Sequence, residues 1–201
     1  YVVSEGFADA ASDEGRARQA RLIAVARSAN IALAGPNCMG VASLHYRFAA
    51  TMADIPSMAA AGSISLVSQS GGLMNAFAEL ATNRGVGVNY LVSSGNEAVL
   101  DFTDFVQYLT DDGSVSLILG YVEGIRNGRR FVAAARGARK AGKAVALLKV
   151  GRSDAGERAA QSHTGALAGS ARIYEAAFRR AGVLAVNDIR SLLDIAAAVP
   201  A

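Results

Sequence analysis

The sequence predicts an α/β fold in which helices cover both faces of a doubly wound parallel sheet. Two observations lead to this prediction. From residue 63 onward, short apolar segments of strand length alternate with longer segments whose apolar residues recur at helical spacing. Glycine- and serine-rich junctions separate strands from the helices that follow, as at Ser70-Gly71-Gly72. Both faces of a parallel sheet are buried, so its strands read as continuous apolar runs.

The expected elements follow one another regularly along residues 63–201. Strands are expected at 63–67, 86–92, 115–122, 144–150 and 183–186. Helices are expected up to residue 83 and at 100–110, 128–141, 170–181 and 188–198. Five strand–helix units of this length suit a flavodoxin-like domain.

The first 62 residues are expected to be organised differently. Residues 1–45 read as the end of a separate α/β unit, with a strand end at 1–4, a helix at 13–29 and a short strand at 31–34. Residues 46–62 show no clear period and are predicted to be a linker to the domain at 63–201. The chain begins with Tyr1 and is expected to be a piece of a longer protein.

Composition argues against several classes of protein. Hydrophobic residues make up 52% of the chain and charged residues 18%, which suits a large core and excludes intrinsic disorder. A net charge of +3 and 6% aromatic residues without tryptophan argue against nucleic-acid binding. The longest uncharged run, residues 55–78, contains proline and polar residues and is a poor membrane span. The single cysteine excludes an internal disulfide and favours a reducing compartment, so a cytoplasmic location is expected.

Two junctions lie where open parallel sheets bind ligands, at the carboxyl ends of strands. In the first, residues 68–72, Ser70, Gly71 and Gly72 open a helix, whose free N–H groups and positive dipole end suit an anion such as phosphate. The second junction, residues 93–97, repeats the arrangement one strand later. A tight turn with a serine cap explains either junction as well, so spacing alone leaves both interpretations open.

His163 is the side chain that points most directly to catalysis. It lies in a glycine-bearing loop before a helix, and a neutral imidazole acts as a nucleophile, base or ligand. Glu123 follows a predicted strand, where its carboxylate can hold the imidazole N–H and fix the tautomer. A surface histidine and a solvated carboxylate are the plain alternatives. Neither His163 nor His45 has a partner at ligand spacing, so no metal site is expected.

Three further residues carry weaker signals. Cys38 could act as a nucleophile, but no base is evident nearby, and a small buried thiol is the favoured interpretation. Lys149 and Arg152 could bind phosphate, although isolated basic residues more often belong to a solvated loop.

Six short motifs occur in an order that resembles a known family. They are Gly35-Pro36-Asn37-Cys38-Met39-Gly40, Ser68-Gln69-Ser70-Gly71-Gly72, Ser94-Gly95-Asn96-Glu97, Tyr121-Val122-Glu123-Gly124, Lys149-Val150-Gly151-Arg152-Ser153 and Ser162-His163-Thr164-Gly165. Together they resemble the NDP-forming acyl-CoA synthetases, the superfamily of the succinyl-CoA synthetase α subunit and the ADP-forming acetyl-CoA synthetases. The resemblance covers essentially the whole chain, and six motifs in register are specific where one alone is weak.

The resemblance implies an acid–thiol ligase. Such an enzyme interconverts acyl-CoA, ADP and phosphate with a carboxylic acid, CoA and ATP, through an acyl phosphate and a phosphohistidine. Residues 1–45 would be the C-terminal end of a Rossmann-type CoA-binding domain, and residues 63–201 a succinyl-CoA ligase-like flavodoxin domain. His163 matches the phosphorylated histidine, and Glu123 is the candidate for its carboxylate partner.

The resemblance also implies binding residues, cofactors and partners. It gives phosphate binding to Ser70, Gly71, Gly72 and Gly165. It makes Asn37, Cys38 and Asn96 candidate residues of a substrate loop. CoA and ATP or ADP with Mg²⁺ would bind largely on other domains, because no Gly-x-Gly-x-x-Gly motif occurs here. The expected partners are an ATP-grasp domain or β subunit, CoA and a small carboxylic acid, in an oligomer without nucleic acid or membrane, and the segment alone is expected to be incomplete.

Three other readings compete with this one. A regulatory acyl-CoA synthetase-like domain of a protein acetyltransferase would lack the histidine, whereas His163 is intact. A serine hydrolase with Ser70 as nucleophile and His163 as base would need a glycine where Ser68 stands. A plain flavodoxin-like interaction domain would leave all of these loops as turns.

Overall fold

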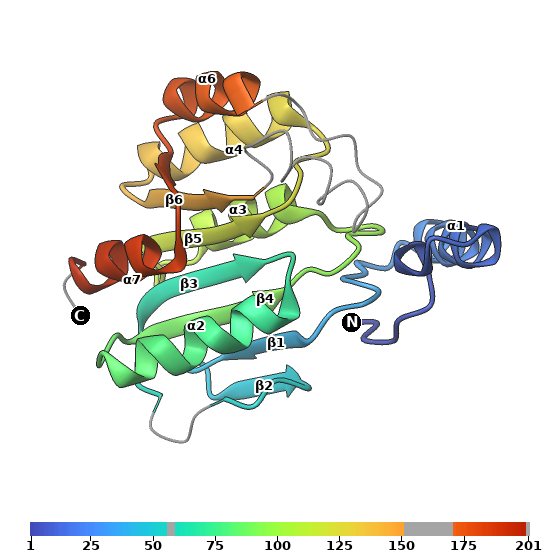
Figure 1. Ribbon diagram of the computed structural model, residues 1–201, viewed down its shortest axis with the longest axis horizontal. Helices are drawn as coiled ribbons and strands as arrows, with labels where there is room; N and C mark the ends of the chain where they lie inside the picture. Colours follow the sequence, from blue (N-terminus) through green and yellow to red (C-terminus); the bar gives the residue numbers. More distant parts are fainter. Residues whose placement is uncertain (56–58, 151–170, 200–201) are drawn as a thin grey trace.

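One mixed sheet organises the computed structural model, which describes residues 1–55, 59–150 and 171–199 (Figure 1). Its strands are β1 (Gly40–Ser43), β2 (Phe48–Thr51), β3 (Ala61–Ser68), β4 (Val88–Ser93), β5 (Leu117–Val122), β6 (Ala144–Lys149) and β7 (Leu184–Val186). Its helices are a 3-10 turn η1 (Ala8–Ala10), α1 (Asp13–Ser28), α2 (Gly71–Asn83), α3 (Phe102–Asp111), α4 (Gly128–Lys140), α6 (Ala171–Ala181) and α7 (Ile189–Ala197). The five strand–helix units predicted from residue 63 onward are therefore present.

The sheet has the order β2-β1-β4-β3-β5-β6-β7 within the described residues. Strands β3 to β7 pair in parallel. β4 lies along one edge of β3, and the chain then crosses over to place β5 along the other edge of β3. This is the doubly wound, flavodoxin-like order, which confirms the predicted fold class.

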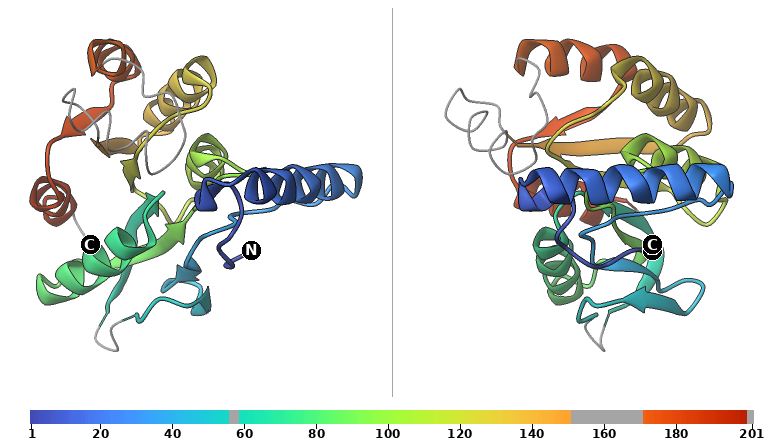
Figure 2. Two further views of the ribbon diagram at one scale, coloured as in Figure 1. Left: turned by 45° about the vertical axis from the view of Figure 1, so that its right-hand side comes forward. Right: turned by 90° about the vertical axis from the view of Figure 1, so that its right-hand side faces the viewer.

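Alternating side chains of the central strands build two separate cores. Leu66 of β3 and Leu119 of β5 face α2 and α7, while Val67 and Ile118 face α3, α4 and α6. Successive side chains of a strand point to opposite faces, so one apolar run supplies both cores. Figure 2 shows the helices on the two sides of the sheet, with α1 standing apart from both faces.

The N-terminal part differs from its prediction in two respects. The predicted linker at 46–62 contains β2 and the start of β3, and β2 forms a hairpin with β1, which pairs antiparallel with β4. The segments expected as strands at 1–4 and 31–34 run side by side through Val2 N to Ala34 O (3.0 Å), without a regular ladder. Strands of four residues are too short to show a period of two, so the sequence pattern did not reveal the hairpin.

Across the described ranges, no helix combines the length and the apolar character needed to cross a membrane.

Two glycines provide opposite tests of the packing. A Cβ added to Gly120 in β5 would lie 2.4 Å from Leu147 Cδ2 and 2.5 Å from Phe102 Cζ, both in a filled core. We expect Gly120→Ala to lower the free energy of unfolding by about 1–3 kcal/mol, the usual effect of overpacking. Nothing lies within 4 Å of the corresponding position at Gly137 in α4. Gly137→Ala should therefore raise stability by about 0.5–1 kcal/mol through helix propensity.

Urea unfolding of the two variants beside the wild type measures both effects. Equal changes in the two midpoints would contradict the packing described for β5.

Candidate functional site

The carboxyl ends of β3, β4 and β5 meet at one edge of the sheet. The register places Ser68 of β3 beside Ser93 of β4 and Tyr121 of β5. The chain reverses its winding direction between β4 and β5, on either side of β3, and doubly wound sheets bind ligands in the crevice at such a switch point. The residues that follow these three strands are therefore brought together, although the sequence separates them widely.

The start of α2 lies at this switch point, directly after β3. Ser70 caps the helix, and its hydroxyl accepts a hydrogen bond from Leu73 N at 3.3 Å. A Cβ on Gly71 would lie 2.2 Å from Met39 Cγ, whereas nothing lies within 4 Å of the same position on Gly72. Gly71 therefore serves packing against Met39, and Gly72 leaves open space beside the positive end of the helix dipole.

Gln69 ties the end of β3 to the end of β5. Its Oε1 accepts hydrogen bonds from the backbone N–H of Glu123 (2.5 Å) and of Gly124 (3.1 Å). Its Nε2 donates to Gly124 O at 2.9 Å, and its own N–H donates to Tyr121 O at 3.1 Å. The motif 68–72 contains Gln69, but no sequence signal distinguished it, because its partners lie more than 50 residues away.

Glu123 lies where the sequence predicted it, directly after β5 and half-buried. Burial and the negative charge of Glu123 raise the pKa of the Tyr121 hydroxyl. The structure thus brings Glu123 to the same edge as Ser70 and Gly72. His163 and Gly165 lie outside the described residues, so their placement stays a prediction.

Lys149 does not belong to a solvated loop. It ends β6, paired with Val122, and only 5% of it is exposed. Its ammonium group donates to Val150 O and lies 4.7 Å from the centre of the Tyr174 ring. Arg152, the other basic residue of that motif, lies outside the described residues.

The loop after β4 contains a buried carboxyl group that the sequence did not single out. Glu97 is 3% exposed, and its Oε1 accepts a hydrogen bond from Ser94 Oγ at 2.9 Å. Burial raises the pKa of Glu97 to about 7, opposed by hydrogen bonds from Gln69 and Ser94 and by the charge of Arg126. The neighbours of Glu97 in the sequence, an asparagine and an alanine, do not predict its burial. The burial results from contacts that form where the strands end.

Asn37 and Asn96 are brought together as the substrate-loop prediction requires. Asn37 Nδ2 donates to Asn96 Oδ1 at 3.2 Å, and Asn96 Nδ2 donates to Asp9 (2.8 Å) and Gln19 (3.0 Å). A Cβ on Gly95 would lie 2.3 Å from a backbone oxygen of the segment that contains Asn37. Glycine therefore lets this segment and the loop after β4 approach each other closely. These contacts join residues 1–37 to the loop after β4, and a role in substrate binding stays a prediction.

Cys38 is the buried thiol that the sequence indicated. It is 5% exposed, and its Sγ donates to Val2 O at 3.4 Å. Burial raises its pKa, which keeps the thiol protonated and unreactive. His45, in contrast, is exposed on the β1–β2 hairpin, with its ring 4.8 Å from that of Tyr46.

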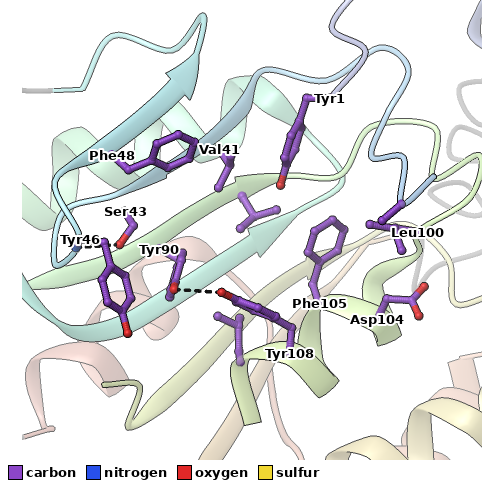
Figure 3. A pocket seen from close by; sticks show the side chains of 13 residues that line it. Tyr1, Val41, Ser43, Tyr46, Phe48, Tyr90, Leu100, Asp104, Phe105 and Tyr108 are labelled. Carbon is purple, nitrogen blue, oxygen red and sulfur yellow. Dashed lines mark hydrogen bonds between the residues drawn. The ribbon is translucent and has the colours of Figure 1, made fainter. Parts of the chain in front are cut away.

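A separate pocket of about 570 Å³ lies between β1, β2, β4 and α3 (Figure 3). Its walls are mostly apolar and aromatic, with Val41, Phe48, Tyr90, Phe105 and Tyr108 among the residues that line it. Tyr90 donates a hydrogen bond to Asp112 at 2.8 Å. No residue in its lining was predicted from the sequence to be part of the site, so the pocket is distinct from the crevice at the switch point.

Within residues 1–55, 59–150 and 171–199, no three His, Cys, Asp or Glu side chains lie close enough together to hold a metal ion. The backbone at the start of α2 is suited to binding an anion through its N–H groups and the helix dipole.

The buried carboxyl group predicts a pH dependence of stability. The folded chain binds a proton at Glu97 up to about pH 7, whereas the unfolded chain releases it near 4.5. The bound proton stabilises the folded state fully below pH 4.5. This stabilisation is lost as the pH rises through about 7. Glu97→Gln removes the titration. We therefore expect the free energy of unfolding of the variant to rise relative to that of the wild type, by up to about 3 kcal/mol, between pH 4.5 and about pH 7, and the difference to stay level above it.

Denaturant unfolding of both proteins across this range tests the prediction. Glu79→Gln, on the exposed face of α2, controls for the substitution itself. A stability difference between Glu97→Gln and the wild type that stays constant with pH would contradict it.

Comparison with known proteins identifies a family. Residues 61–199 match the family model described as the succinyl-CoA ligase-like flavodoxin domain. The α subunit of ADP-forming acetate–CoA ligase II from Pyrococcus furiosus is 39% identical over 197 residues, which are 98% of this chain and 42% of that subunit. ADP-forming acetate–CoA ligase I from Archaeoglobus fulgidus is 40% identical over 195 residues, 97% of this chain and 28% of that protein.

A solved structure shows the same fold. It is the dinucleotide-forming acetyl-coenzyme A synthetase 1 of Candidatus Korarchaeum cryptofilum, in complex with phosphate and ADP. It superposes with a TM-score of 0.90 at 32% identity, over 97% of this chain and 41% of that one. The chain thus spans less than half the length of these relatives. It belongs to the family of succinyl-CoA ligase-like flavodoxin domains.

Proposed function

We propose that this chain is part of an NDP-forming acyl-CoA synthetase. The enzyme would interconvert acyl-CoA, ADP and phosphate with a small carboxylic acid, CoA and ATP. The main observation behind the proposal is that the N-terminus of α2 and Glu123 lie together at the switch point. Gln69, just before α2, accepts a hydrogen bond from the backbone N–H of Glu123. Relatives named as ADP-forming acetate–CoA ligases support this reaction.

The chemistry assigns one step to each part of the crevice. Neutral His163 attacks the phosphorus of an acyl phosphate, an N–P bond forms, and the carboxylate leaves with the P–O electron pair. Glu123 accepts the N–H of the other ring nitrogen and stabilises the charged imidazole. The N–H groups and dipole at Ser70, Gly71 and Gly72 stabilise the phosphoryl oxygens. ADP then takes the phosphoryl group from the histidine and becomes ATP.

The remaining components belong to the complete enzyme. Residues 1–45 would contribute the end of a CoA-binding domain. Asn37 and Cys38, before β1, and Asn96, in the loop after β4, would take part in binding the substrate. An ATP-grasp domain or β subunit would hold the nucleotide and Mg²⁺, in a cytoplasmic oligomer. The α-subunit name of one relative supports a partner subunit, and the phosphate and ADP of another support these two ligands.

The serine hydrolase alternative conflicts with the geometry of Ser70. A nucleophilic serine of that class sits on a strained turn. Ser70 has φ −105° and ψ 119°, an ordinary extended conformation, and its hydroxyl caps α2. The regulatory-domain alternative is decided by whether His163 becomes phosphorylated.

Removing His163 tests the relay directly. In the complete ligase with labelled ATP and no acyl substrate, we expect wild-type protein to hold acid-labile, base-stable phosphate that maps to His163. His163→Ala should abolish this phosphate and the overall reaction, and leave the fold intact. His45→Ala, at an exposed hairpin position, is the matched control and should keep both. Full activity of His163→Ala would overturn the mechanism, and a wild type that binds nucleotide without phosphorylation would favour the regulatory domain.

Replacing Glu123 tests the carboxylate partner. Glu123→Gln keeps the shape but loses the charge that stabilises the imidazolium, so we expect single-turnover phosphorylation to slow by about 10²-fold, as for a lost acid–base partner. Binding of the partner subunit, measured by sedimentation, should not change. Unchanged rates in rapid-quench experiments would remove Glu123 from the site, and Glu79→Gln is the control at an exposed position.

A further inference from the structure

Gln69 lies at the point where β3 and β5 stop pairing and their chains diverge. The register of the two strands ends at Ser68 and Tyr121, after which β3 leads into α2 and β5 into the loop before α4. One more backbone bond follows, from Gln69 N to Tyr121 O at 3.1 Å. In a regular parallel pair the next bond would run from Glu123 N to the backbone carbonyl of Gln69. Here Glu123 N donates to the side-chain oxygen, Gln69 Oε1, at 2.5 Å.

Both polar atoms of the Gln69 side chain contact the backbone that follows β5. Oε1 accepts from the N–H of Glu123 and also from that of Gly124, the latter at 3.1 Å. Nε2 donates to Gly124 O at 2.9 Å. Rotating the amide by 180° would set its NH₂ group against two N–H donors and its oxygen against a carbonyl. Only one orientation satisfies all three contacts, so a side chain at this position must both accept and donate.

The backbone of Gln69 is itself held on both sides. Ser68 is fully buried, and its Oγ donates to Ser70 O at 2.6 Å and accepts from Ser70 N at 3.1 Å. These bonds fix the chain around Gln69, and the Ser70 hydroxyl then caps α2 through Leu73 N. Because the amide stands on a fixed backbone, it ties the position of Glu123 to that of the α2 N-terminus.

We propose that Gln69 is a positioning residue for Glu123, whose backbone it holds in a fixed place relative to the start of α2. The proposal rests on the proposed function, in which Glu123 holds the catalytic imidazole and the start of α2 stabilises the phosphoryl oxygens. The spacing of these two groups then decides the geometry of phosphoryl transfer. Since a misplacement of about 1 Å can cost about 10²-fold in rate, loss of the amide slows the reaction through Glu123.

Glutamate is an informative replacement, because the role requires an acceptor and a donor on one side chain. A protonated carboxyl group has the shape of the amide, its C=O can accept from the two N–H groups, and its O–H can donate to Gly124 O. The ionised form loses the donor and sets a negative charge against that carbonyl oxygen. A carboxyl group with an unperturbed pKa of about 4.3 is partly protonated at pH 5 and ionised at pH 8. Gln69→Glu should therefore resemble the wild type more closely at the lower pH.

Single-turnover phosphorylation of the complete ligase, with labelled ATP and rapid quench, tests the proposal. We expect Gln69→Leu, which has no polar side-chain atoms, to slow phosphorylation by roughly 10- to 100-fold at pH 5 and at pH 8. Steady-state KM values for CoA and for the acid should stay unchanged. The rate of Gln69→Glu relative to wild type should be higher at pH 5 than at pH 8 by at least about threefold. Gln107→Leu and Gln107→Glu, at an exposed position of α3, are the matched controls and should keep the wild-type rate.

A double-mutant cycle with Glu123→Gln tests whether the amide acts through Glu123. Glu123→Gln alone is expected to be slow, and adding Gln69→Leu should slow it by less than about threefold further, because both changes remove one function. Circular dichroism of each variant checks the fold. If Gln69→Leu does not fold, Gln69→Ala, which removes the amide without adding an apolar branch, takes its place.

The outcomes separate this inference from the proposed function. A wild-type rate in Gln69→Leu, together with a slow Glu123→Gln, would overturn the positioning role and leave the relay standing. A rate of Gln69→Glu relative to wild type that is the same at both pH values would overturn the need for a paired acceptor and donor. Independent losses in the double-mutant cycle would overturn the action through Glu123. A wild-type enzyme that forms no phosphohistidine would overturn the proposed function, and the positioning role with it.

Discussion

The register of β3 against its two neighbours is the constraint on which both the core and the site depend. It sets Ser68 beside Ser93 and Tyr121, so that three strands end at one level. A slip of one residue would exchange Leu66 and Val67 between the two cores. The same slip would carry Gln69 away from the backbone that it holds after β5. Packing of the apolar side chains therefore fixes where the three strand ends meet.

The loop after β4 connects two parts of the molecule. On one side, Glu97 is buried and accepts a hydrogen bond from Ser94 Oγ at 2.9 Å. On the other, Asn96 binds Asp9, Gln19 and Asn37 of the N-terminal unit. This loop thus contacts the end of β3, through Ser94 N to Ser68 O at 2.8 Å, and also the N-terminal segment. One short loop therefore holds the N-terminal segment against the edge of the sheet where the three strands end.

Features governed by local rules could be predicted from the sequence, and those that depend on distant contacts could not. The strand–helix units from residue 63 follow from apolar runs, and the Ser70 cap and the buried Cys38 follow from their neighbours in the chain. The hairpin at 40–51 was missed, because four-residue strands show no period. The contacts of Gln69 and the burial of Glu97 were missed, because they arise only when strand ends meet. The predictions for His163 and Gly165 rest on the family resemblance.

The same contacts explain why the six motifs are informative as a set and weak singly. Met39 of the first motif fills the space beside Gly71 of the second, and its N–H donates to Ser93 Oγ at 3.0 Å. Ser68 O of the second motif accepts from Ser94 N of the third at 2.8 Å, and Gln69 Nε2 of the second donates to Gly124 O of the fourth at 2.9 Å. The fifth begins at the end of β6, where Val150 N donates to Val122 O of the fourth at 3.1 Å. Each of these five motifs is a partner of another, so a chain that keeps their order and spacing keeps one three-dimensional crevice.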